Sequence, residues 1–464
     1  MRSDPILDAF SALVRHDAHA PLVASCSRTA PRGEIDALAT RLASRLAASV
    51  TPGASVLLAA RNGAGFLAAL LGVRRAGLVP ALCDHAAPAT ERERCARALG
   101  APLEVVCDEP FPGDADTIRV RATGVPPLPP EGDYVKITSG TSGEPGGVAI
   151  AAEALAADDD QLTASMGLRP DDRLLAPIPW SHSYGLSSLA LPALRRGSLL
   201  ILPEDGGPWA PLAAARALSA TVFPTVPVYL RTIVGVVPRD AWPATLSHVI
   251  TAGTRLAPED ARAFRETFGR RVHVFYGASE CGGIAYDREG GAAERGTVGT
   301  PVEGVTVGLD EGAVTVSSPA VARRHVPTPR ASLSHGTFRT ADRAIWTSDG
   351  ELRLLGRIDA VINVEGKKVE PAEVEGVLGS LSGVREAVVL GVRAAGSEKE
   401  IVRAVIAREP GRLSYEEVSA WCRKHLAPHK VPRSIVLLDA IPRTERGKVD
   451  RGALAALDAK DDRK

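Results

Sequence analysis

The sequence lacks several features that would assign it to well-known classes of protein. Its six cysteines are scattered and form no CxxC pair, so neither a zinc cage nor a disulfide framework is indicated. Basic and acidic residues number 55 each, so no net field draws the chain to nucleic acid or to an anionic membrane. No apolar run reaches membrane-spanning length, and the N-terminal stretch has no signal-peptide core. We therefore expect a cytoplasmic globular protein.

The order of the predicted elements indicates an α/β protein. Apolar residues recur at helical spacing over 34–49 and 153–166, and further helices are expected over 186–195 and 258–268. Strand-like runs such as 55–60, 103–107, 134–137 and 248–251 lie between the helical segments. Helices and strands that alternate in this way predict parallel sheets wound with helices. The first part of the chain is therefore expected to consist of wound parallel α/β subdomains.

The pattern changes twice further along the chain. Short alternating runs over 296–316 predict a small β-rich subdomain. A composition break near Gly356 precedes a hairpin-like segment and further short elements, including a helix expected over 415–425 and a strand over 434–438. These elements can fold as a separate small α+β unit. At 464 residues the chain has room for about two or three domains. We place two domains, at residues 1–356 and 357–464.

A glycine-rich loop, ITSGTSGEPGGV over 137–148, lies between two extended runs. Glycines let such a loop turn backbone N–H groups and hydroxyls inward around an anion, so we interpret it as a polyphosphate site. The alternative is a flexible linker, which normally lacks a strand on each side. No Gly-Lys-Ser/Thr follows, so a phosphotransferase of the Walker type is disfavoured.

Other segments could complete a nucleotide site, although each has an ordinary structural alternative. Tyr276 at a predicted strand end leaves an aromatic face for stacking, and Glu280 just beyond could hold magnesium; the alternative is a surface glutamate. Asp342 is expected at a turn, where it could accept bonds from ribose hydroxyls or simply cap the turn. Lys448 lies in a cationic segment, 441–451, that could equally be a solvated tail.

Together and in this order, the segments resemble the motifs of the adenylate-forming superfamily of acyl- and aryl-CoA synthetases, peptide-synthetase adenylation domains and luciferases. Residues 138–147 match its phosphate loop, 276–280 its Tyr-Gly-x-Thr-Glu motif, 340–342 its Thr-Gly-Asp, 356–359 its Gly-Arg-x-Asp hinge and 442–448 its Pro-Arg-Thr-x-x-Gly-Lys motif. The resemblance extends over residues 42–451, and it implies a large N-terminal domain followed by a small mobile C-terminal domain.

The resemblance also implies an activity. A carboxylic acid would be activated by ATP and Mg²⁺ to acyl-AMP with release of pyrophosphate, and the acyl group would then form a thioester with CoA. The residues it assigns to the nucleotide are Thr138, Ser139, Gly140, Thr141, Ser142 and Gly143 for the phosphates; Ala252, Gly253, Thr254, Tyr276 and Gly277 for adenine; Asp342 and Arg357 for ribose; and Glu280 with Thr141 for the metal. Lys448 would bridge the substrate carboxylate and the α-phosphate, Asp359 would be the hinge, and Gly366 would line the thiol tunnel.

The acyl pocket is expected around the stretch PWSHSYGLSS. The matched positions are His182, Ser183, Tyr184, Gly185, Val226, Ala278 and Ser279, with His182 also assigned to catalysis and gating, although a lone histidine is often structural. No aspartate lies between residues 177 and 188, where relatives that activate amino acids keep one. An α-amino acid is therefore disfavoured, and an aryl or medium apolar acid is favoured.

One departure from the motif leaves alternatives open. Gly146 stands where the phosphate loop of the superfamily has a lysine, which removes a positive charge from the leaving phosphates and predicts weaker handling of ATP. A catalytically degenerate nucleotide-binding protein is one alternative, although Glu280, Asp342, Arg357 and Lys448 are all retained. Another is an adenylation enzyme that loads the phosphopantetheine arm of a carrier protein in place of CoA.

Overall fold

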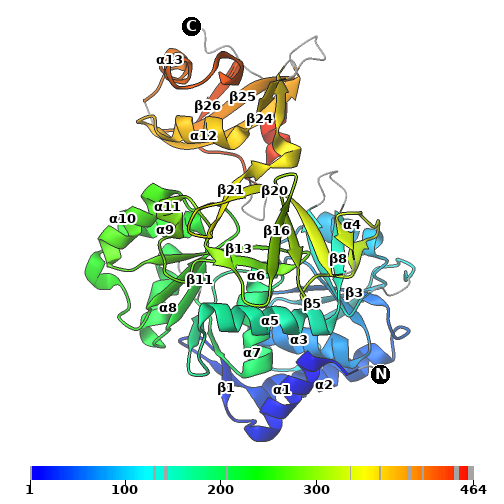
Figure 1. Cartoon of the computed structure of the whole chain (residues 1–464). Coiled ribbons are helices and arrows are strands. Elements are labelled where there is room, and N and C mark those ends of the chain that lie inside the picture. Colours follow the sequence, from blue (N-terminus) through cyan, green and yellow to red (C-terminus); the bar gives the residue numbers. More distant parts are fainter. Residues whose placement is uncertain are drawn as a thin grey trace. The chain divides into compact units, whose positions relative to one another are not determined.

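The computed structural model describes residues 3–128, 132–139, 145–204, 207–334, 336–364, 367–393, 400–409, 412–443 and 449–457 (Figure 1). The chain folds as two compact units. Unit 1 comprises Met1–Gly308, Thr315–Thr340 and Trp346–Arg353, and unit 2 comprises Leu309–Val314, Ala341–Ile345 and Leu354–Lys464. Over the described ranges, no helix combines the length and the apolarity that crossing a membrane requires.

The first large sheet of unit 1 has seven strands in the order β18-β8-β7-β4-β3-β5-β6. The strands are β3 (Ser55–Ala60), β4 (Val79–Leu82), β5 (Leu103–Cys107), β6 (Arg119–Ala122), β7 (Tyr134–Ser139), β8 (Pro145–Ile150) and β18 (Arg324–Val326). β3, β4, β5 and β7 run parallel to one another. At the edges of the sheet, β6 pairs with β5, β8 with β7 and β18 with β8, each antiparallel. Helices α2 (Arg32–Ala47), α3 (Ala64–Arg75) and α4 (Ala89–Leu99) connect this part. α3 is buried from Ala64 to Val73, as an apolar sequence on every side of a helix requires.

The second large sheet has nine strands in the order β15-β14-β13-β12-β11-β9-β10-β1-β2. These strands are β1 (Pro21–Ala24), β2 (Thr29–Pro31), β9 (Arg173–Leu175), β10 (Leu199–Ile201), β11 (Val222–Thr225), β12 (His248–Thr251), β13 (Val272–Ala278), β14 (Gly282–Tyr286) and β15 (Thr300–Pro301). The helices of this part include α1 (Pro5–His16), α5 (Ala152–Met166), α8 (Ala210–Ala217), α9 (Pro227–Val236), α10 (Pro258–Phe268) and α11 (Ala292–Arg295). The pairs β10–β9, β9–β11, β11–β12 and β12–β13 are all parallel.

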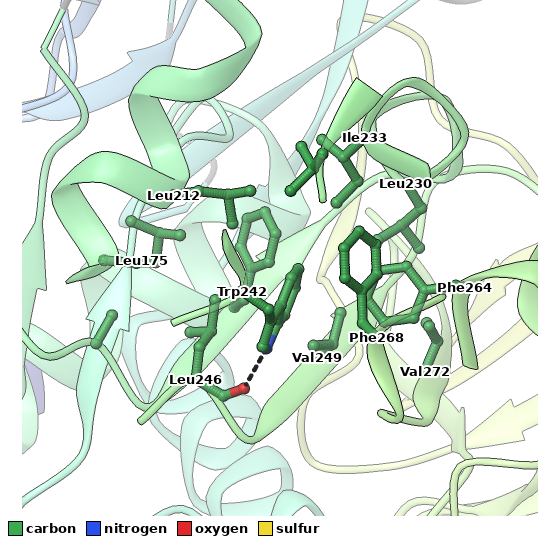
Figure 2. Packing of buried hydrophobic residues seen from close by; sticks show 14 of the residues in the cluster. Leu175, Leu212, Leu230, Ile233, Trp242, Leu246, Val249, Phe264, Phe268 and Val272 are labelled. Atoms are coloured by element: carbon green, nitrogen blue, oxygen red, sulfur yellow. Dashed lines mark hydrogen bonds between the residues drawn. The ribbon is translucent and has the colours of Figure 1, made fainter. Parts of the chain in front are cut away.

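Trp242 lies at the centre of the core between this sheet and its helices (Figure 2). Its ring packs against Phe264 at 5.3 Å and Phe268 at 4.9 Å between centroids, and its indole N–H donates to the carbonyl of Leu246 at 2.9 Å. The indole is therefore both buried and satisfied, which fixes α10 against β12 and the loop before it.

Unit 2 contains a three-stranded sheet, β24 (Val384–Arg393), β25 (Glu400–Arg408) and β26 (Ser434–Leu438), and a hairpin of β22 (Ile362–Val364) and β23 (Lys367–Val369). Helices α12 (Pro371–Gly379), α13 (Tyr415–His425) and α14 (Arg451–Ala456) accompany them. A small five-stranded sheet is made of β16 (Thr306–Asp310), β17 (Ala313–Ser317), β19 (Leu333–Ser334), β20 (Thr337–Trp346) and β21 (Leu352–Arg357), and the division between the units passes through its strands.

The predicted α/β architecture is confirmed, and several elements have the predicted bounds, namely β3, β5, β12, α10, α13 and β26. The helix predicted over 186–195 is not a regular α-helix. It begins with a π-helical turn, Leu186–Ala190, and continues as α7 (Leu191–Arg196). Pro192 explains the change, because its ring would clash with the carbonyl four residues earlier in a continuous α-helix.

The prediction that Asp342 lies at a turn is wrong. Asp342 lies within β20, a strand of ten residues in which Phe338, Thr340 and Ala344 are buried. The turn was inferred from the local composition of Thr340, Ala341 and Asp342, and the pairing of a long strand overrides such local preferences.

Candidate active site

The carboxyl ends of β11, β12 and β13 bring the predicted adenine and acyl-pocket residues to one edge of the nine-stranded sheet. Thr225 pairs with Thr251, and Thr251 pairs with Val274, so the residues that follow each pairing point lie side by side. The predicted residues at this edge are Val226, Ala252, Gly253, Thr254, Tyr276, Gly277, Ala278 and Ser279. Ligands of open α/β sheets bind outside the carboxyl ends of the strands, which is where these residues lie.

A loop after β9 joins this edge to the carboxyl edge of the seven-stranded sheet. Asn62, just beyond β3, donates from Nδ2 to the carbonyl of Ile178 at 2.8 Å and accepts from the Trp180 N–H at 2.9 Å. Trp180 is fully buried, and its ring lies 5.7 Å from that of Phe66 between centroids. The loop that carries His182 is therefore fixed to both sheets.

His182 has an acidic partner that the sequence did not indicate. Its Nε2 lies 2.9 Å from Oδ2 of Asp84, a residue two positions beyond the end of β4. The Asp84 carboxylate is 12% exposed, and its other oxygen accepts from the N–H of Ala86 at 2.9 Å. A carboxylate oriented in this way fixes the ring of a histidine and selects the tautomer with a proton on Nε2.

The residues after His182 connect to the Tyr276–Glu280 motif. Ser183 Oγ donates to Ser279 Oγ at 2.7 Å, and the ring of Tyr184 lies 5.6 Å from that of Phe275 between centroids. The Tyr184 hydroxyl donates to the carbonyl of Ile250 at 3.1 Å, and burial raises its pKa well above the usual value, so the hydroxyl is neutral. The predicted acyl-pocket residues are thus held by defined contacts.

Gly185 is required by a close approach of the backbone. A Cβ at this position would lie 2.0 Å from the carbonyl oxygen of Pro179, far inside contact distance. The sequence SYG therefore lets the chain fold back tightly and present His182 and Ser183 together.

The turn between β13 and β14 places Glu280. Gly282 has φ +70, and a Cβ there would lie 2.1 Å from Oδ1 of Asp158. The buried Asp158 accepts from the N–H of Gly283 at 2.9 Å and from Ser187 Oγ at 2.6 Å, and the carbonyl of Glu280 accepts from the N–H of Ala322 at 2.7 Å. These bonds fix the backbone on both sides of the Glu280 carboxylate.

The Glu280 carboxylate is held ionised. Oε1 of Glu280 lies 3.3 Å from Nε2 of His325 on β18. Burial alone would raise the pKa of Glu280, but the hydrogen bond from His325, together with the charges of His325 and Lys136, outweighs burial and lowers it. An ionised carboxylate oxygen is the kind of ligand that magnesium prefers.

The surroundings of Glu280 fit a magnesium ion that is shared with phosphate oxygens. The Glu280 side chain is 20% exposed, so its carboxylate can be reached. Throughout the part of the chain that the structure describes, no three His, Cys, Asp or Glu side chains gather as a metal cage. Magnesium in nucleotide sites is typically held by one or two carboxylates and the substrate phosphates, which this arrangement allows.

The two predicted ribose-binding residues lie near each other in unit 2. Nη1 of Arg357 at the end of β21 lies 3.9 Å from Oδ1 of Asp342 on β20. The side chains are 49% and 24% exposed, respectively, so this ion pair is open to solvent.

The remaining predicted residues cannot be placed. Gly140, Thr141, Ser142, Gly143, Gly366 and Lys448 lie outside the described residues, as do the side chains of Ser139 and Asp359. Thr138 is described: it pairs with Gly146 across the β7–β8 hairpin, at the point where the phosphate loop begins.

Comparison with known proteins now identifies the family. The model of the AMP-binding enzyme family matches residues 18–322, and the model of the AMP-binding enzyme C-terminal domain matches residues 373–448. The chain belongs to the AMP-binding enzyme family. The predicted membership of the adenylate-forming superfamily, which includes these enzymes, is confirmed.

Several known CoA ligases and synthases are similar to this chain. It is 30% identical over 363 residues to an oxalate–CoA ligase of Arabidopsis thaliana, which covers 74% of this chain and 70% of the relative. It is 28% identical over 478 residues to a feruloyl-CoA synthase of Amycolatopsis, covering 94% and 96% of the two chains. Among solved AMP-binding enzymes, the o-succinylbenzoate CoA synthetase of Bacillus subtilis with its acyl-adenylate has the same fold, with TM-score 0.83, 22% identity and 98% of each chain covered.

Four residues of this AMP-binding enzyme were not identified from the sequence: Asn62, Asp84, Lys136 and His325. Asn62 and Asp84 each lie two residues beyond a parallel strand, β3 and β4, so a search for polar residues at strand carboxyl ends would have found them. Lys136 and His325 lie inside strands, and no signal in the sequence marks them.

Proposed function

We propose that the protein is an AMP-forming acid–CoA ligase. It would activate a carboxylic acid with ATP to an acyl-adenylate, release pyrophosphate, and pass the acyl group to the thiol of CoA. The observation that supports this most directly is the junction of the two carboxyl edges, where Asp84 holds His182 and Ser183 bonds to Ser279, the residue before Glu280. The names of the relatives, which are CoA ligases or synthases, support the same reaction.

The nucleotide would be held by the residues that match the superfamily motifs. Tyr276 would stack on adenine with Ala252–Thr254 opposite, Asp342 and Arg357 would bind the ribose hydroxyls, and the loop from Thr138 would surround the phosphates. Glu280 would hold magnesium, which when bound supplies positive charge beside the phosphate oxygens. Two anions must approach each other in this step, so donors and cations fixed around them lower the barrier.

His182 would orient the acid beside the α-phosphate. With Nε2 donating to Asp84, the other ring nitrogen carries a lone pair, and the ring stands at a fixed angle at the pocket. Lys448 would bridge the substrate carboxylate and the α-phosphate, because a flexible ammonium can follow charge as it moves between the two groups.

The second step, thioester formation, would use the hinge and the thiol tunnel that the motifs indicate. Asp359 would act as the hinge, and Gly366 would let a pantetheine arm pass close to the backbone. Departure of AMP from the acyl carbon would accompany attack by the thiolate, which forms the thioester.

The acid would be aromatic or a medium-sized apolar acid. The rings of Tyr184 and Phe275 and the side chain of Val226 lie at the carboxyl edge, and their apolar surface suits such a group. The similarity to a feruloyl-CoA synthase over nearly the whole chain supports an aryl acid.

Hydroxylamine trapping tests this proposal. The purified protein is incubated with ATP, magnesium and a panel of aryl, fatty and short acids, and hydroxamate and pyrophosphate are measured. We expect both products with an aryl acid, none with Lys448→Ala, and a thioester when CoA replaces hydroxylamine. A thioester formed only with a carrier protein would reject CoA as acceptor, and no hydroxamate with any acid would reject the ligase activity.

A further inference from the structure

Lys136 is a buried lysine in the middle of β7. Its side chain is 1% exposed, and its ammonium nitrogen has no hydrogen-bond partner among the described residues. Burial lowers the pKa of this ammonium, and the nearby Asp158, Cys281 and Glu280 oppose the change. Burying an ammonium without hydrogen bonds destabilises a fold, so a position that packing alone determined would favour an apolar side chain.

The strand register shows which groups share a face with Lys136. Lys136 pairs with Val148 on β8, and Val148 pairs with His325 on β18. Residues directly opposite one another in antiparallel strands point to the same face, so Lys136 and His325 lie on either side of Val148 on one face. His325 contacts the Glu280 carboxylate at 3.3 Å. The charges of both side chains act on that carboxylate, since His325 and Lys136 each lower its pKa.

Gly146 belongs to the same face. It pairs with Thr138, two pairs along the ladder from Lys136 and Val148, and side chains two residues apart on a strand point the same way. Lys136 and Gly146 are thus diagonal neighbours, a relationship that places two positions about 7–8 Å apart. The superfamily motif has its lysine at Gly146, so this face lacks one lysine and carries another on the adjacent strand.

We infer that Lys136 is a positioning residue that supplies, from β7, the fixed positive charge that the phosphate loop lacks at Gly146. It acts through Glu280: the ammonium and His325 together hold the carboxylate toward the metal that ATP brings. This inference rests on the proposed function for its ligand, MgATP. It also explains how a loop without its lysine can remain part of an active enzyme.

The test combines two substitutions. Lys136→Met removes the charge and keeps the length of the side chain, and Gly146→Lys puts a lysine at the position of the superfamily motif. We expect Lys136→Met to weaken MgATP binding about tenfold by calorimetry, while the melting temperature without ligand stays equal or rises. Gly146→Lys should restore binding in the Lys136→Met protein by roughly fivefold or more, but change the wild-type protein less than about twofold.

Gly146→Ala is the matched control for shape. A Cβ at Gly146 would lie 3.1 Å from the carbonyl oxygen of Val326, so any side chain here displaces that strand slightly. Gly146→Ala adds the same Cβ without charge, and it should rescue nothing in the Lys136→Met background. Rescue by alanine as strong as by lysine would overturn the inference, because a backbone shift rather than charge would then be responsible.

Other outcomes are equally decisive. Unchanged MgATP affinity in Lys136→Met, or additive effects of the two substitutions, would overturn the role of Lys136. If Lys136→Met does not fold, Gly146→Lys in the otherwise wild-type protein tests the inference. A tenfold gain in MgATP affinity in that variant would overturn it, because the gain would mean that Lys136 does not already supply the missing charge. Failure of the proposed function has a different signature: MgATP binds and responds to these substitutions, but no acid gives hydroxamate.

Discussion

Nε2 of His182 lies 2.9 Å from Oδ2 of Asp84, across a separation of 98 residues in the chain. The contact joins the loop after β9 to the end of β4, so it connects the carboxyl edges of the two large sheets of unit 1. Because Asp84 is largely buried, its carboxylate is less screened by water than a surface ion pair would be.

The first prediction concerns this pair. Asp84→Asn should lower the rate of hydroxamate formation about tenfold, because the amide cannot hold the His182 tautomer as a carboxylate does. The melting temperature should change little, since the two side chains are nearly the same size. A loss of activity that follows a loss of stability would contradict a role in orienting His182.

Asp108→Asn is the control for this substitution. Asp108 follows β5 as Asp84 follows β4, and its Oδ1 lies 2.9 Å from Nε2 of His85. The Asp108 side chain is 49% exposed, and neither Asp108 nor His85 belongs to the proposed site. We expect this variant to retain the activity of the wild-type protein.

The second prediction compares two glycines. Gly185→Ala should destabilise the protein by roughly 1–3 kcal/mol and reduce hydroxamate formation, because the new Cβ would press against the Pro179 carbonyl and move His182. Gly235 lies in α9, and a Cβ there would meet no atom within 4 Å outside its chain neighbours and the backbone of its own helix, so Gly235→Ala should stabilise by about 0.5–1 kcal/mol. Thermal unfolding followed by circular dichroism measures both, and equal effects would contradict the steric argument.

The contrast between α10 and Asp342 shows what sequence patterns could and could not predict. α10 begins at Pro258 and ends before Gly269, so a proline and a glycine mark both ends, and the prediction gave its bounds. The stretch 338–342 predicts a turn at Asp342, but the conformation of Asp342 is determined by pairing along β20. Local signals therefore predict elements better than they predict pairing.

The site shows the same limit. The motifs identified His182, Tyr276 and Glu280 because each stands in a recognisable stretch. Asp84 and His325, which contact His182 and Glu280, and Asn62, which fixes the loop before His182, come from distant parts of the chain, and only the fold brings them close. The sequence predicts only that Lys136 lies in an extended run. A lysine in a strand gives no sign of which charges will surround it in the fold.

The third prediction concerns the ribose. If Asp342 accepts bonds from ribose hydroxyls, the wild-type protein should prefer ATP to 2′-deoxy-ATP, and Asp342→Asn should reduce that preference about tenfold. Pyrophosphate release measured with each nucleotide gives the ratio. Asp349→Asn, an exposed aspartate in the turn after β20, serves as the control and should keep the preference. An unchanged ratio in Asp342→Asn would remove Asp342 from the ribose site.

The last prediction concerns the dependence of stability on pH. His248 at the start of β12 lies 2.6 Å from the Tyr286 hydroxyl through Nε2, and its ring lies 4.6 Å from that of His273 between centroids. Burial and the neighbouring His273 lower the pKa of His248 to about 4, against a small opposing effect of Asp172. The unfolded chain has an ordinary histidine pKa of about 6.5, so below that pH it binds a proton that the folded protein does not.

Because the unfolded chain binds the extra proton, the free energy of unfolding decreases as the pH falls. The stabilising contribution of neutral His248 is complete above about pH 6.5 and is lost as the pH falls toward 4, by up to about 3 kcal/mol. His248→Gln cannot take up a proton, so its free energy of unfolding should fall less between about pH 7 and 5 than that of the wild-type protein. Urea unfolding at several pH values measures the slope, with the exposed His19→Gln as control. Equal slopes for His248→Gln and the wild-type protein would show that His248 is protonated in the fold.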